Sequence, residues 1–119
     1  MANRTNRAAP ERASPDTKAR ALMCAQALDA SRIKDISIIE VGSVLQVVEY
    51  FVVGTGGAAR QLQSAADELE HCLKEHGVRK LGKEGYGEGR WVLIDFGDVV
   101  VHLMREVAAS SDPTASGSK

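Results

Sequence analysis

The stretch that decides the fold is "WVLIDFGDVVVHLM", Trp91 to Met104. Two runs of β-branched and aliphatic residues flank a Phe-Gly-Asp corner, which is typical of a β-hairpin with a tight turn. The two-residue turn is either Phe96-Gly97 or Gly97-Asp98. In either register, each cross-strand pair joins an odd-numbered residue to an even-numbered one. Both registers therefore place the same residues on the same face.

One face of this hairpin is uniformly apolar and is predicted to be the core: Val92, Ile94, Phe96, Val99, Val101 and Leu103. The other face mixes an indole, a carboxylate, an imidazole and aliphatic groups: Trp91, Leu93, Asp95, Val100, His102 and Met104. Apolar area with a few orienting polar groups is typical of a protein-binding surface. The alternative is a second core layer, because two helices can cover both faces of a sheet or only one.

Upstream of the hairpin, an apolar run leads through a glycine-rich corner into an amphipathic pattern. A strand is predicted at about Val47 to Val53, and a helix follows Gly57 and ends at Gly77. The helix places its apolar residues on one face: Leu62, Ala65, Ala66, Leu69, Cys72 and Leu73. The segment between this helix and the hairpin, Arg79 to Arg90, is predicted to be a mobile surface loop or, alternatively, a flexible contact arm.

The glycine-rich corner matches the spacing G-x-G-x-x-A of a dinucleotide-binding turn, with Gly54, Gly56 and Ala59. Such a site also needs an acidic residue at the end of a second strand about twenty residues later. The corresponding region, "HGVRKLGKEG", contains neither. A small nucleotide-binding domain that uses Gly54 to Arg60 is therefore kept only as the alternative function.

The N-terminal half adds a helix and another strand. Residues 14–33 predict a helix with Ser14 as N-cap, Pro15 at the first position, and an apolar stripe at Leu22, Ala25 and Leu28. A strand at about 36–41 follows, separated from the next strand by Gly42 and Ser43. Residues 1–13 are predicted to be a disordered basic arm and residues 107–119 a disordered tail, which leaves one α/β domain over 14–106.

Composition limits the function. A chain of 119 residues with 44% hydrophobic residues can bury one small core, and its net charge of -1 gives no global attraction to nucleic acid. There is neither a membrane-length apolar run nor a signal-peptide pattern, so a cytoplasmic protein is expected. Cys24 and Cys72 lack metal-ligand spacing and are predicted to be buried free thiols.

An enzyme is not expected, and neither a metal nor a cofactor is predicted. Asp67, Glu68 and Glu70 lie on the polar face of the second helix rather than on strands, where carboxylates could hold magnesium. Asp95 and Asp98 flank a tight turn and point to opposite faces, so we expect a backbone role for this acid-glycine corner.

Two motifs carry a family resemblance. "EYFVVGTGGAARQL" and "WVLIDFGDVVVHL" resemble the patterns D-Y-F-V-I-A-T-G-x-S-x-R-Q-V and W-V-L-L-D-Y-G-D-V-V-V-H of the ribosomal silencing factor family, RsfS or Iojap. The resemblance covers about Ser14 to Met104. The chain departs from the family at Glu49, Ala58, Ala59 and Phe96. After Glu106 it lacks the acidic, aromatic segment with which family sequences continue.

The resemblance implies a small mixed β-sheet with two main helices, similar to the nucleotidyltransferase fold but without its catalytic carboxylates. It further implies docking on protein fourteen of the large ribosomal subunit, which blocks joining of the small subunit and represses translation when nutrients are scarce. No direct sequence-specific contact with nucleic acid is expected, and a homodimer through the Trp91 face is an additional alternative. The corner of Gly54, Gly56, Gly57 and Arg60 is then expected to serve the strand-to-helix turn. The residues expected to bind the partner are Trp91, Leu93, Asp95, Phe96, Asp98, His102, Glu49 and Tyr50.

Overall fold

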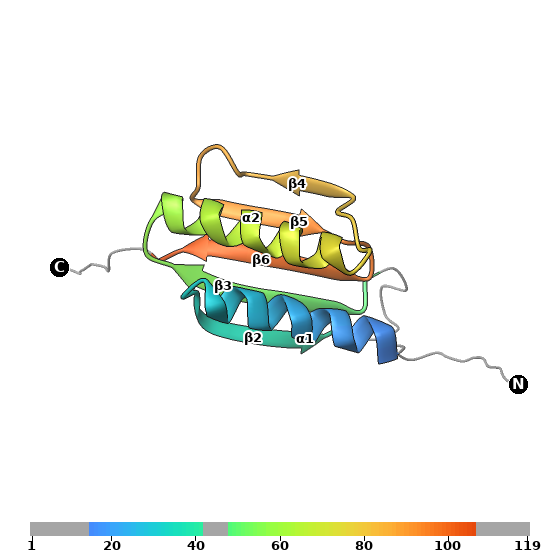
Figure 1. Cartoon of the computed structure of the whole chain (residues 1–119). Helices are drawn as coiled ribbons and strands as arrows, with labels where there is room; N and C mark the ends of the chain where they lie inside the picture. Colours follow the sequence, from blue (N-terminus) through green and yellow to red (C-terminus); the bar gives the residue numbers. More distant parts are fainter. Residues whose placement is uncertain (1–14, 42–47, 107–119) are drawn as a thin grey trace, which may run out of the picture.

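Two helices cover one face of a five-stranded sheet in the computed structural model of the chain, which describes residues 15–41 and 48–106 (Figure 1). The helices are α1, Pro15–Ala30, and α2, Ala59–Glu75. The strands are β2, Lys34–Glu40; β3, Tyr50–Gly56; β4, Gly82–Glu84; β5, Trp91–Asp95; and β6, Val99–Arg105. The predicted basic arm and the predicted tail lie outside the described residues.

The sheet is mixed, as predicted. Its strand order is β2-β3-β6-β5-β4, with β3 and β6 parallel and every other neighbouring pair antiparallel. Figure 1 shows α1 lying across β2 and β3 and α2 lying across β5 and β6, on the same side of the sheet. This arrangement confirms the predicted small mixed sheet with two main helices.

The hairpin of β5 and β6 follows the predicted register. Asp95 pairs with Val100, and the Phe96 amide donates to the Val99 carbonyl at 2.9 Å, so the turn is Gly97-Asp98. Gly97 has φ +96°, a conformation that favours glycine. The whole predicted core face is buried against the helices, each side chain being at most 7% exposed: Val92, Ile94, Phe96, Val99, Val101 and Leu103.

The buried stripe of α1 differs from the prediction. Leu22 is 47% exposed, whereas the residues buried at helical spacing are Thr17, Ala21, Cys24 and Leu28. Small side chains let a helix approach a sheet and a second helix closely, so the stripe of Ala21 and Cys24 faces inward. Burial raises the pKa of the Cys24 thiol to about 12, and this free thiol is therefore neutral and unreactive. Cys72 is also free but only half-buried.

The segment from Arg79 to Arg90, here called the strap, is bound to α2 and is more than the predicted loop. It contains β4, which pairs with β5. Tyr86 anchors the strap, because its hydroxyl donates to Asp67 at 2.9 Å and its carbonyl accepts from Gln63 at 2.8 Å. The sequence Gly-Lys-Glu of β4 has no apolar pattern, which is why the strand was missed.

Glu70 holds the first half of the strap to α2. Its carboxylate oxygens lie 2.9 Å from Lys80 Nζ and 2.6 Å from Lys83 Nζ. Burial by itself would raise the pKa of the Glu70 carboxyl, but the two lysines outweigh it and lower the pKa below the ordinary value of 4.5. The acidic residues Asp67 and Glu70 therefore have structural partners within the chain.

We expect Glu70→Gln to lower stability at neutral pH and to matter less in acid. A carboxyl whose folded pKa is depressed contributes stability above its unfolded pKa, and this contribution is lost as the pH falls through the folded pKa. The difference between parent and variant should therefore shrink below about pH 4.5 in urea unfolding measured across a pH series. A difference that stays constant from pH 7 to pH 3 would contradict this account.

None of the helices that the structure describes is long and apolar enough to cross a membrane.

Candidate docking surface

The face of the sheet opposite the helices carries the predicted binding residues of the hairpin. Strand pairing sets Trp91 beside Met104 and Leu93 beside His102 across β5 and β6. The parallel register of β3 and β6 then adds Val53 beside His102. We call this surface the open face, and its residues are Phe51, Val53, Trp91, Leu93, Asp95, Val100, His102 and Met104.

No helix among residues 15–41 and 48–106 covers the open face, because α1 and α2 both pack on the other side. Trp91 is 38% exposed and Met104 is 41% exposed, while Leu93 is half-buried. The alternative of a second core layer under the first helix was therefore wrong. Large apolar side chains that a folded chain leaves partly exposed in one contiguous patch are typical of an interaction surface.

His102 lies at the centre of the open face. Its ring meets that of Phe51 edge to face, with 5.2 Å between centroids and an interplanar angle of 87°. Burial lowers the pKa of the His102 imidazole below its ordinary value of 6.5, so the ring is neutral at pH 7. His102 thus adds to the apolar area and carries no positive charge into it.

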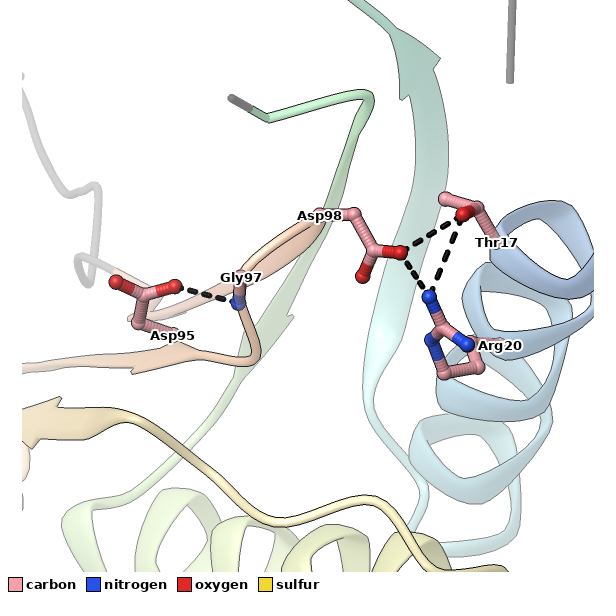
Figure 2. Close-up of polar contacts among 5 residues, drawn as sticks. All are labelled: Thr17, Arg20, Asp95, Gly97 and Asp98. Atoms are coloured by element: carbon pink, nitrogen blue, oxygen red, sulfur yellow. Dashed lines mark hydrogen bonds and ion pairs between the residues drawn. The ribbon is translucent and has the colours of Figure 1, made fainter. Parts of the chain in front are cut away.

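The two aspartates of the turn face different ways, as the parity of the hairpin predicted (Figure 2). The Asp95 carboxylate accepts a hydrogen bond from the Gly97 amide at 2.8 Å and stays half-buried at the border of the open face. Asp98 points to α1, where it accepts from the Thr17 hydroxyl at 2.7 Å and forms an ion pair with Arg20. Asp98 therefore fastens the turn to the helix.

Two more residues of the predicted binding set lie away from the open face. Phe96 and Tyr50 are each 7% exposed and belong to the core on the helix side. Glu49 is half-buried, and its amide donates to the Asp98 carbonyl at 2.8 Å. The structure thus brings together Trp91, Leu93, Asp95 and His102, and it places Phe96, Tyr50 and Asp98 on the helix side of the sheet.

Phe51, Val53, Val100 and Met104 belong to the open face but were not in the predicted binding set. Met104 could have been found from the parity of the hairpin, which already placed it beside Trp91. Phe51 and Val53 lie in a run whose odd-numbered and even-numbered residues are both apolar. Only the parallel register of β3 and β6 therefore shows which of them lie on the open face.

The glycine-rich corner is built differently from the prediction. Gly54 and Gly56 lie within β3, which extends to Gly56, and neither has a positive φ. A Cβ on Gly54 would lie 2.4 Å from Ile33 Cγ2, and one on Gly56 would lie 2.6 Å from Leu62 Cδ1. These glycines therefore allow close packing and are not required by a turn.

The start of α2 is held by Gln61. Its side-chain oxygen accepts from the Gly57 amide at 2.7 Å, and its side-chain nitrogen donates to the Arg32 carbonyl at 2.8 Å. The Gly57 amide, which would face a phosphate in a dinucleotide site, is thus already bonded within the chain. Arg60 is exposed beside this corner. Within the described part of the chain, no group of three or more metal-ligating side chains was found.

A family model described as "Ribosomal silencing factor during starvation" matches residues 14–108. The chain belongs to the RsfS family. It is 36% identical over 84 residues to the ribosomal silencing factor RsfS of Bacillus subtilis, which covers 71% of each chain. A crystal structure of a protein from Chromobacterium violaceum has a TM-score of 0.72 and 35% identity, and the match covers 75% of this chain and 74% of that one.

A mouse protein named "Mitochondrial assembly of ribosomal large subunit protein 1" is 32% identical over 74 residues, which is 60% of this chain and 32% of the mouse protein. The solved structure confirms the α/β fold at the level of the RsfS family.

Proposed function

We propose that this RsfS family chain is a regulator without enzymatic activity that binds the large ribosomal subunit in the cytoplasm. Its open face docks on protein fourteen of that subunit, at the surface where the small subunit would join. Joining is then blocked, and translation is repressed when nutrients are limiting. The single observation that carries the proposal is that the helices of this RsfS family chain cover only one face of its sheet and leave Trp91 exposed on the other.

The chemistry of the open face supports a protein as the partner. Trp91, Leu93 and Met104 supply apolar area, and aromatic anchors dominate the binding energy of most protein interfaces. Asp95 adds one negative charge at the border, which suits a basic ribosomal protein. The names of the relatives, a ribosomal silencing factor and a protein of large-subunit assembly, support the large subunit as the particle bound.

We expect the protein to cosediment with isolated large subunits and not with small subunits or assembled ribosomes. The reason is steric, because the small subunit and this chain would compete for one surface. Sedimentation through a sucrose cushion, followed by detection in the pellet, measures the bound fraction. Equal recovery with all three particles would count against the proposal.

A further inference from the structure

Five cationic side chains gather at one end of the sheet, where β3 and β6 end. The Arg105 amide donates to the Arg90 carbonyl at 2.8 Å, and Arg105 pairs with Gly56 at the end of β3. On the far side of β3, Lys34 pairs with Thr55. Gln61, which bonds the Arg32 carbonyl, follows Arg60 at the start of α2. We call this group the basic end: Arg32, Lys34, Arg60, Arg90 and Arg105.

The side chains of the basic end are exposed and form no ion pair within the described residues. Elsewhere Arg20, Lys80 and Lys83 are each bound to a carboxylate. Five carboxylates lie near the basic end by sequence, pairing, a backbone hydrogen bond or a shared hollow, namely Asp29, Asp35, Glu68, Glu88 and Glu106. Of these, Asp35 accepts a hydrogen bond from the Thr55 hydroxyl. None of these acids forms an ion pair with a cation of the basic end among the described residues, so the five cationic groups remain available to an external anion.

The basic end is continuous with the open face. Arg90 directly precedes Trp91, and Arg105 directly follows Met104. Trp91 and Met104 are paired and form the last row of the open face. A partner that covers Trp91 would thus bring the surface beyond it against the basic end.

We propose that the basic end binds the phosphate backbone of ribosomal RNA beside the docking site, while the open face contacts the ribosomal protein. This inference rests on the proposed function. Four of the five cations are arginines, whose planar guanidinium groups bind phosphate oxygens in a bidentate manner. The contact reads no base sequence, because backbone contacts fix position and give affinity without sequence information.

The decisive variant replaces Arg60, Arg90 and Arg105 together by Gln. The matched control replaces Lys18, Lys74 and Arg79 by Gln, which removes the same charge from exposed positions outside the basic end. Binding to large subunits is measured over a series of KCl concentrations. Each lost phosphate contact should reduce the slope of log affinity against log salt by about one, so the triple variant should lose roughly three. A triple variant with the slope of the control would overturn the inference.

A second measurement uses a labelled double-stranded RNA oligonucleotide without any ribosomal protein. The parent should bind it in a salt-dependent manner, the Trp91→Ala variant should bind it equally well, and the triple variant should bind it at least tenfold more weakly. If the triple variant loses affinity for the subunit but not for the RNA, the basic end contacts an acidic protein surface and the inference is wrong. If the parent binds the RNA through the basic end but does not bind large subunits, the phosphate site stands and the proposed function fails.

Discussion

Trp91→Ala should lose large-subunit binding while the fold survives. Trp91 has the largest side chain of the open face and is 38% exposed in the free chain, so truncation removes apolar area that a partner can contact. Truncating an aromatic anchor of an interface typically costs about 2 kcal/mol or more, which is roughly thirtyfold in affinity. Binding to large subunits and to isolated protein fourteen would measure the loss.

Asp95→Arg should have a similar effect by a different mechanism. It replaces attraction to a basic protein by repulsion, but it also removes the acceptor for the Gly97 amide. Asp95→Asn separates the two effects, because its side-chain oxygen can still accept that hydrogen bond while the negative charge is gone. We expect Asp95→Asn to weaken binding less than Asp95→Arg does.

Glu75→Arg is the control for both changes. Glu75 is exposed near the end of α2, on the helix side of the sheet, where its only ion pair among the described residues is with exposed His71. Asp67 would be a poor control because it anchors Tyr86. Circular dichroism and a melting curve accompany each variant. Loss of binding by Glu75→Arg, or normal binding by Trp91→Ala, would place the docking site elsewhere.

Gly54→Val should unfold a large fraction of the protein at physiological temperature. The position is buried in the interior strand β3, and even a Cβ would lie 2.4 Å from Ile33 Cγ2. Ile33 is itself only 4% exposed and has little room to move. We expect a loss of about 3 kcal/mol or more in the free energy of unfolding, or roughly 10 to 20 °C in Tm.

Gly57→Ala is the matched control for that glycine. A Cβ there would meet only the Gln61 side chain, at 3.7 Å, and the φ of Gly57 is not positive. Calorimetric titration of the parent with ATP, GTP and NAD tests the nucleotide alternative for the same corner. Saturable binding at micromolar concentration would favour that alternative. In the stability measurement, a Gly54→Val variant as stable as the parent would contradict the packing role of Gly54.

The hairpin was predictable because successive side chains of a strand point to alternate faces, and this alternation can be read from the local sequence. Its parity placed Val92 and Leu103 in the core and Trp91 outside, and no tertiary information was needed. Whether a helix covers Trp91 depends on where two helices dock, and this was not encoded in any local pattern. The parallel pairing of β3 and β6 was equally invisible, so Phe51 and Val53 were missed.

Other differences have a common cause, which is close packing. Gly54 and Gly56 resembled a phosphate-binding turn because glycine also allows close approach of a side chain to a strand. Ala21 and Cys24 are buried and Leu22 is exposed because the helix side that approaches its neighbours most closely carries small residues. The basic end is assembled from four separate segments, so its charges could not be recognised along the chain.

Subunit joining tests the central claim most directly. Purified large and small subunits are mixed in a stopped-flow instrument, and light scattering reports the formation of whole ribosomes. Large subunits that are first incubated with excess protein should give a strongly reduced amplitude, without any nucleotide, and the Trp91→Ala variant should restore most of it. An undiminished amplitude at a protein concentration that saturates the large subunit would contradict the proposal.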